Sequence, residues 1–205
     1  MKVLEQQSRN FIHGGVDTSP EFPTLKSKLV RLRQLRYKDI PTMPRLVTVH
    51  VVRYLVHVPY PYGMVDARRF INKSRRNFQL KKGLDFAIEL VDNGSLVGVI
   101  SLQKIDKASK NAQMGYWIGN KYWNMGIATE SINLVIHHAF HVLRLHKVYA
   151  NVLATNRASI RVLEKNGLKR EGVLKHSIYK DDKFYDVVLY YRLNRRLTNA
   201  RLRSK

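Results

Sequence analysis

The chain has 205 residues, 44% of them hydrophobic, and its 37 Lys and Arg against 15 Asp and Glu give a net charge of +22. Length and hydrophobic content predict a single globular domain, and the absence of cysteine excludes disulfides, thiolate nucleophiles and Cys-ligated metals. Because no apolar run approaches about 18 residues and the N-terminus lacks a signal or transit pattern, we expect a cytoplasmic protein with no membrane partner.

The domain boundaries are predicted from where hydrophobic residues begin and cease to recur at regular spacing. Residues 1–23 are polar and contain Gly and Pro, which predicts a mobile lead-in. The domain is expected to span residues 24–193, and residues 194–205 form a basic tail.

The N-terminal part of the domain has mixed patterns. The run KLVRLRQLR, residues 28–36, is an imperfect strand pattern, and residues 37–55 combine helical spacing with two prolines, which predicts one or two short, broken helices. A loop rich in Pro and Tyr follows at residues 58–63, and a helix is predicted from Asp66 to Asn77 with Phe70 and Ile71 on its inner face.

The middle of the chain predicts an antiparallel meander. Two β-rich runs, residues 84–91 and 96–103, flank Asn93-Gly94, a strong hairpin signal. An aromatic-rich run at residues 112–119 adds a third strand.

The C-terminal half alternates helices and strands. One amphipathic helix is predicted between Gly126 and Arg144, and a second, short helix begins with Asn156 as its N-cap and ends at Gly167. A strand at residues 147–154 separates them, and residues 170–193 are predicted to form a hairpin that turns at 180–183. The sum is an α+β fold with a mixed sheet flanked by helices.

The segment YWNMGIATES, residues 122–131, lies where the third strand gives way to the long helix. Small residues at Gly126 and Ala128 leave the backbone accessible, and free N–H groups at a helix N-terminus attract anions. The pattern is neither a Walker loop nor a dinucleotide fingerprint. It predicts a phosphate-binding loop of another kind; the alternative is that Gly126 is a turn residue and Ala128 a packing residue.

Three segments, in order, carry a family resemblance: YWIGNKYWNMGIATES, NRASIRVLEKNGLKREGVL and YDVVLYYRL. Together they resemble the GCN5-related N-acetyltransferase (GNAT) superfamily, and within it the Rim-type branch that acetylates N-terminal amines of ribosomal proteins. The resemblance covers roughly residues 25–193. It implies a GNAT fold: a mostly antiparallel, twisted sheet in which acetyl-CoA lies between two parallel strands that splay apart, here MGYWIG and KVYANVLA.

The resemblance also implies which residues contact acetyl-CoA. The end of the first of those strands pairs through its backbone with the pantetheine arm, and the following loop holds the pyrophosphate. Asn156 and Ser159 match the family's N-x-x-S, whereas Trp123 and Asn124 depart from its usual loop residues. The implied contacts are Trp117, Ile118, Gly119, Trp123, Asn124, Met125, Gly126, Ile127, Ala128, Thr129, Asn156 and Ser159.

Catalysis is less well specified than cofactor binding. The resemblance implies that an acid protonates the leaving thiolate, and because Leu163 stands where many GNATs have a tyrosine, Ser159 or water is expected to serve. Related sequences often carry carboxylates where this chain has Gln113 and Ile178, so the amine proton is expected to leave through water to Gln113, His176 or bulk solvent. Without a strong base, a protein α-amine of pKa about 7.7 to 8.0 is a better acceptor than lysine.

Three functions remain open at this stage. The leading one is acetyl-CoA-dependent acetylation of a protein N-terminus by a monomer or homodimer, with the charge favouring ribosome or RNA association. The alternatives are a non-catalytic GNAT-fold binding module and acetylation of a small amine. The charge itself has a second interpretation, a basic bias of the proteome.

Other residues suggest chemistry more weakly. His137 and His141 are one helical turn apart, a spacing that suits zinc, but we expect a solvated face and no metal. Tyr60 and Tyr62 are expected to wall the acceptor groove or to pack a loop, and Asp186 and Tyr190 to support the fold.

Overall fold

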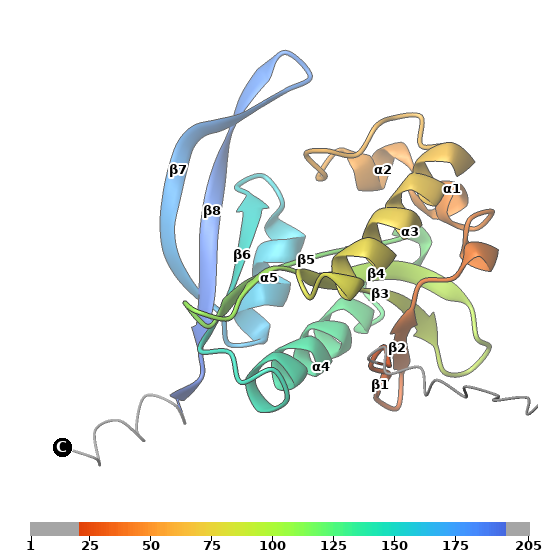
Figure 1. Cartoon of the computed structure of the whole chain (residues 1–205). Coiled ribbons are helices and arrows are strands. Elements are labelled where there is room, and N and C mark those ends of the chain that lie inside the picture. Colours follow the sequence, from red (N-terminus) through yellow and green to blue (C-terminus); the bar gives the residue numbers. More distant parts are fainter. Residues whose placement is uncertain (1–20, 196–205) are drawn as a thin grey trace, which may run out of the picture.

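The computed structural model describes residues 21–195 of the chain. Over these residues, eight strands form one sheet in the order β1-β2-β3-β4-β5-β6-β8-β7 (Figure 1). All neighbouring strands are antiparallel except β5 and β6. The strands are β1 (Leu25–Lys26), β2 (Val30–Gln34), β3 (Gly83–Leu90), β4 (Leu96–Asp106), β5 (Asn111–Ile118), β6 (Lys147–Leu153), β7 (Lys169–Lys180) and β8 (Lys183–Leu193). The predicted mixed sheet is confirmed.

Helices cover both faces of the sheet (Figure 1). One face packs against α1 and α3, and the other against α4 and α5. The helices are α1 (Met43–Leu46), α2 (Val49–Val52), α3 (Met64–Gln79), α4 (Ile127–His141) and α5 (Arg157–Lys165), with 3-10 turns η1 (Tyr37–Asp39) and η2 (Asn120–Tyr122).

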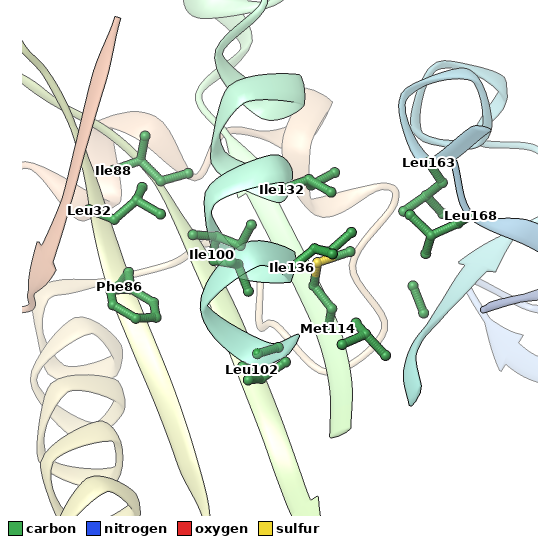
Figure 2. Packing of buried hydrophobic residues seen from close by; sticks show 14 of the residues in the cluster. Leu32, Phe86, Ile88, Ile100, Leu102, Met114, Ile132, Ile136, Leu163 and Leu168 are labelled. Atoms are coloured by element: carbon green, nitrogen blue, oxygen red, sulfur yellow. The ribbon is translucent and has the colours of Figure 1, made fainter. Parts of the chain in front are cut away.

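The core is built by alternation along the strands. In β3, Phe86 and Ile88 point to the side of α4, whereas Ala87 between them points to the side of α3. Figure 2 shows the larger cluster, in which Ile132 and Ile136 of α4 pack on the sheet. Successive residues thus fill both layers, which is why β3 is buried along its whole length.

The region of short helices differs in detail from its prediction. It holds two four-residue helices, α1 and α2, preceded by the 3-10 turn η1. Pro44 lies in the first turn of α1, where its missing N–H costs nothing. The helix predicted from Asp66 to Asn77 is longer at both ends and spans Met64–Gln79. It starts earlier because the Asp66 carboxylate accepts the Gly63 N–H at 2.9 Å.

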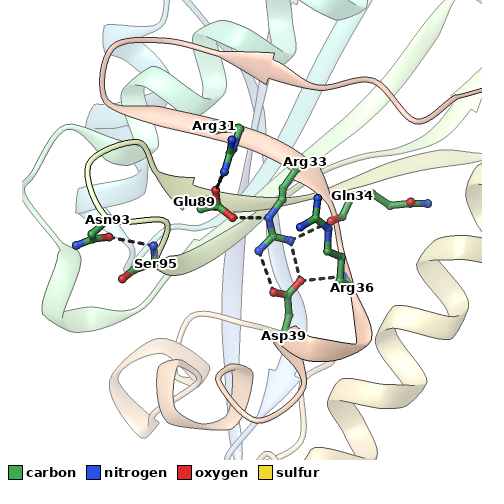
Figure 3. A network of polar contacts seen from close by, with 8 residues as sticks. All are labelled: Arg31, Arg33, Gln34, Arg36, Asp39, Glu89, Asn93 and Ser95. Carbon is green, nitrogen blue, oxygen red and sulfur yellow. Dashed lines mark hydrogen bonds and ion pairs between the residues drawn. The ribbon is translucent and has the colours of Figure 1, made fainter.

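A buried ionic network ties β2 to β3 and η1 (Figure 3). The Arg33 guanidinium donates to both oxygens of Asp39, at 2.8 and 2.9 Å, and to Glu89. Burial alone would raise the pKa of Glu89, but hydrogen bonds from Arg33 and Arg31 outweigh it, so the pKa is lowered and the carboxylate stays charged. This network fixes where the chain leaves the sheet for α1.

The two ends of the chain lie mostly outside the described residues. The predicted lead-in, 1–23, and basic tail, 194–205, have only Glu21–Pro23 and Asn194–Arg195 in the described part. Phe22, which the sequence analysis assigned to the lead-in, packs edge-on against Phe78 and Phe86 with ring centroids 4.9 and 5.1 Å away.

Candidate functional site

A break in the sheet between β5 and β6 creates the site. The two strands pair in parallel only at Asn111, Ala112 and Gln113 of β5, opposite residues 147–149 of β6. Beyond Gln113 no pairing remains between them, although β5 continues to Ile118 and β6 to Leu153. Polar backbone groups on the inner edges of both strands are therefore left free to bind a ligand.

A cavity of about 560 Å³ occupies this gap. The splayed halves of β5 and β6, the loop before α4 and the first turns of α5 form most of its wall, and residues at and after α2 close one side. The lining residues that were predicted from the sequence are Trp117, Ile118, Trp123, Asn124, Met125, Gly126, Ile127, Ala128, Thr129, Asn156 and Ser159. Their roles stay predictions, but the fold brings eleven of the twelve predicted contacts to one cavity.

The loop before α4 turns sharply at two residues. Gly126 is the N-cap of α4 with φ of 77°, in the left-handed region, and Asn124 has φ of 62°. A Cβ on Gly126 would meet its nearest neighbour, Leu29 Cδ2, at 3.9 Å, so backbone conformation rather than crowding within the protein requires glycine here. The first-turn N–H groups of α4, at Ile127 to Thr129, face this loop without an intrahelical acceptor.

Gly119 is explained by packing instead. Its N–H donates to Val97 O at 2.9 Å, and an added Cβ would lie 2.8 Å from Leu46 Cδ2 of α1. It does not line the cavity. Along a strand, the N–H and C=O groups of successive residues point alternately to the two neighbouring strands. Since Gly119 bonds to β4, the N–H and C=O of Ile118 point toward the gap. There the Trp123 indole N–H donates to the Ile118 carbonyl at 2.8 Å.

The first turn of α5 places a hydroxyl in the cavity. The Asn156 side chain caps the helix by accepting the Ser159 N–H at 3.1 Å, as predicted for a cap. The Ser159 Oγ lies 3.0 Å from the phenol oxygen of Tyr116, which crosses from β5. Burial raises the pKa of Tyr116, although the hydrogen bond to Ser159 partly opposes this, so the phenol is neutral at neutral pH.

Sequence reasoning missed several of the lining residues. Tyr116 was quoted in the family-like segment but given no role, and Arg161 and Lys165 of α5 bring positive charge to the wall. Tyr54 and Leu55, which follow α2, also line the cavity. The helical spacing of Arg161 and Lys165 was visible, but only the fold shows that this face of α5 meets the gap.

The remaining predicted residues lie elsewhere. Gln113 is in the paired part of β5, opposite Tyr149, and does not line the cavity. Ile178 and His176 are on β7, where His176 donates its backbone N–H to Asp186. That bond is the largest cause of the lowered pKa of Asp186, with a contribution from Lys175.

His137 and His141, two of the three histidines of α4, lie close together. His137 is exposed, and its ring centroid lies 4.3 Å from that of His141. Within residues 21–195 there is no group of three or more potential metal-ligating side chains. No helix of that part is long and apolar enough to cross a membrane.

Only the start of the loop after α2, at Tyr54, Leu55 and Val56, lines the cavity, and Tyr60 and Tyr62 do not. Tyr60 is exposed, whereas burial, aided by the charge of Asp66, raises the pKa of Tyr62 to about 12. The Lys180 ammonium, from the tip of the β7–β8 hairpin, donates to Val52 O at 2.7 Å and Leu55 O at 2.9 Å. The hairpin is thereby attached to the chain segment that closes the cavity.

Comparison with known proteins gives a consistent picture. Residues 30–169 match the family model described as acetyltransferase (GNAT) domain. The chain is 29% identical over 169 residues to the uncharacterized N-acetyltransferase YoaA of Bacillus subtilis, covering 82% of this chain and 96% of that protein. It is 32% identical over 170 residues to the putative ribosomal N-acetyltransferase YdaF of the same organism, covering 81% and 92%.

More distant similarities extend to other acceptors and to solved structures. The spermidine N(1)-acetyltransferase of Vibrio cholerae is 27% identical over 105 residues, covering 51% of this chain and 61% of that protein. The structure of Mycobacterium smegmatis RimJ in complex with a CoA disulfide superimposes with a TM-score of 0.77 at 24% identity, covering 85% of this chain and 88% of that one. The similarity to that structure shows the shared fold.

Proposed function

The chain belongs to the GNAT acetyltransferase family, and from this premise we propose that it acetylates the N-terminal α-amine of a protein. Its class is an acetyl-CoA-dependent N-acetyltransferase. The observation that carries the proposal is the cavity between the splayed strands β5 and β6, which ends at the loop and helix N-terminus around Gly126. The proposed location is the cytoplasm.

In this proposal the cavity binds acetyl-CoA along its length. The first-turn N–H groups of α4 and the positive end of that helix hold the pyrophosphate, which Gly126 and Ala128 allow to approach closely. The pantetheine arm takes the place of the missing strand pairing beside Ile118. Arg161 and Lys165 add positive charge at the same wall.

The charges around the cavity favour a neutral amine as acceptor. No Asp, Glu or His is among its lining residues in the described part of the chain, whereas Arg161 and Lys165 are cationic. A base able to deprotonate a lysine of pKa about 10.4 is therefore absent from the wall, but an α-amine of pKa about 7.7 to 8.0 is partly neutral without one. A polycation such as spermidine would meet like charge, so the small-amine alternative is disfavoured.

Calorimetry followed by a peptide panel tests the proposal. The full chain, freed of nucleic acid, is titrated with acetyl-CoA and then assayed for CoA release on peptides with free N-termini, the same peptides acetylated at the N-terminus, and spermidine. Turnover only on free N-termini is expected. Turnover on the blocked peptides, through lysine, or preferentially on spermidine would overturn the choice of acceptor, and binding without any turnover would favour the non-catalytic alternative.

We further propose that the ribosome or another RNA attracts the protein through one face of α3, here named the α3 basic face. It consists of five exposed basic residues on one side of the helix, Arg68, Arg69, Lys73, Arg75 and Arg76. None of them makes an ion pair with a described residue. Arg75 also lies over the Tyr37 ring. Like charges on one helix face repel, and phosphates would relieve that repulsion.

Charge reversal tests this second proposal. The triple variant Arg68→Glu, Arg69→Glu, Lys73→Glu should bind single-stranded RNA more weakly, with the slope of log affinity against log salt smaller by about 2. The control reverses Lys169, Arg170 and Lys183, which are exposed on β7 and β8, and changes net charge equally. Equal weakening in both triples would mean that overall charge, and not this face, attracts RNA.

A further inference from the structure

The Tyr116 phenol is the strongest polar feature of the cavity that the proposed function does not yet use. Tyr116 projects from the splayed half of β5, lines the cavity and reaches α5, where its oxygen lies 3.0 Å from Ser159 Oγ. Its ring packs against the hydrophobic cluster beneath. Both hydroxyls are partly buried, and the hydrogen bond between them satisfies one donor and one acceptor of the pair.

Two further lining residues, Leu163 and Trp123, are poorly suited to donate a proton to Ser159. Leu163, one helical turn further along α5, is 1% exposed and offers only carbon atoms to the cavity. The Trp123 indole N–H is already bonded to Ile118 O. Among the described residues, Tyr116 is the side chain that contacts the Ser159 hydroxyl.

The backbone around Ser159 fixes that hydroxyl in place. The Asn156 side chain holds the Ser159 N–H, so the first turn of α5 is anchored independently of Tyr116. A phenol is a stronger acid than an alkyl hydroxyl, which makes Tyr116 the better donor and Ser159 the better acceptor of the pair. The remaining Ser159 proton is then free to point into the cavity.

We propose that Tyr116 and Ser159 form a two-hydroxyl relay that delivers a proton to the sulfur of the leaving CoA; this rests on the proposed acetyltransferase function. The amine nitrogen forms a bond to the acetyl carbon, and the carbon–sulfur bond breaks with its electron pair remaining on sulfur. Sulfur takes the Ser159 proton as Ser159 takes the Tyr116 proton. The proton that the amine nitrogen loses to solvent returns to the Tyr116 oxygen, so the relay is restored and the products are an amide and a free thiol.

The relay makes Tyr116 a positioning residue that acts through Ser159. Tyr116→Phe keeps the ring and its packing but removes the hydroxyl, so kcat should fall about a hundredfold while acetyl-CoA affinity, measured by calorimetry, changes less than about twofold. The matched control is Tyr190→Phe. Its hydroxyl also donates to α5, to Glu164 at 2.8 Å, but it lies outside the cavity. The control should keep the wild-type kcat.

A double-mutant cycle separates the relay from a structural role. If Tyr116 acts only through Ser159, the double variant Tyr116→Phe, Ser159→Ala should be no slower than Ser159→Ala alone. Losses that multiply, an unchanged kcat in Tyr116→Phe, or a loss of acetyl-CoA affinity in proportion to the loss of kcat would each overturn the relay while leaving the acetyltransferase function standing. No turnover by the wild-type protein on any amine would overturn both.

Discussion

At the scale of single residues, Gly126 shows how one position serves both the fold and the proposed site. The left-handed φ of 77° at the N-cap of α4 requires glycine, and the same absence of a side chain leaves the first-turn N–H groups open. The sequence left two explanations for this glycine open, the close approach of a phosphate and a turn. The left-handed φ confirms the turn, and the approach of a phosphate stays a prediction.

Substitution of Gly126 should affect both stability and binding. Gly126→Ala is expected to lower the free energy of unfolding by roughly 1 to 2 kcal/mol, because an L-residue is strained at this φ. It should also weaken acetyl-CoA binding about tenfold, since the methyl group sits at the loop. Gly172→Ala on β7 is the control, because a Cβ there meets nothing within 4 Å. Equal acetyl-CoA affinity in wild type and Gly126→Ala would argue against the phosphate position.

His138 gives a pH-dependent prediction. It is buried on α4 beside the Phe86 ring, and its Nε2 has no hydrogen-bond partner among residues 21–195. Burial, aided by the nearby His137, lowers the pKa of His138. As pH falls through about 6.5, the unfolded chain takes up a proton that the folded state resists, so the free energy of unfolding decreases.

His138→Leu should remove this effect. Between pH 7.5 and 5.5, chemical denaturation should show the wild type losing roughly 1 kcal/mol more stability than the variant. The variant should also be the more stable protein at pH 5.5, because an unpaired buried nitrogen has been removed. Parallel pH curves for the two proteins would contradict the assignment, and His50→Leu, at an exposed position of α2, serves as control.

At the scale of elements, the regular segments were predictable and the irregular ones were not. The hairpin β7–β8 turns at Asp181-Asp182, both in the left-handed region, where the sequence placed the turn at 180–183. The end of α5 at Gly167 was also predicted: Gly167 and Leu168 donate to Glu164 O and Leu163 O, the two bonds of a Schellman motif. These features depend on local chemistry, which a sequence displays directly.

The segment from η1 to α2 depended on contacts that the sequence does not display. Its prolines correctly indicated broken helices, but the buried bond of Arg33 to Asp39, between β2 and η1, decides where the chain turns. An arginine that alternates with apolar residues in a strand pattern is expected to face solvent, whereas the Arg33 side chain is buried, with 4% of the residue exposed. Only the pairing of β2 with β3 brings Glu89 to the same guanidinium.

The contact of the β7–β8 hairpin with α2 predicts a role in acceptor binding. Lys180→Met removes two hydrogen bonds to Val52 O and Leu55 O and should loosen the wall formed by Tyr54 and Leu55. The KM for the acceptor peptide should rise about fivefold with little change in acetyl-CoA affinity, since a single hydrogen bond contributes about 1 kcal/mol. Lys183→Met, directly across the turn, is the control. A change confined to acetyl-CoA affinity would refute this role.

At the scale of the whole molecule, the net charge of +22 affects stability as well as partners. The α3 basic face gathers five cations that form no ion pair within the described part of the chain, and self-repulsion of this kind destabilises a compact state. Raising NaCl from about 10 mM to 300 mM shortens the Debye length from about 30 Å to below 10 Å and should raise the melting temperature. The triple reversal on α3 should reduce that rise, and a melting temperature independent of salt would exclude repulsion as a significant cost.

The sequence by itself determined the family, the order of the longer helices and strands, the ends of α5, the turn of the β7–β8 hairpin and the loop at Gly126, because these depend on residues close together in the chain. The tertiary structure decided which side chains meet. Pairing between β5 and β6 stops after Gln113, and this opens the cavity that lets Tyr116 reach Ser159 from 43 residues away. Contacts over such separations depend on how the sheet pairs and splays, and hydrophobic periodicity records only which face of each element is buried.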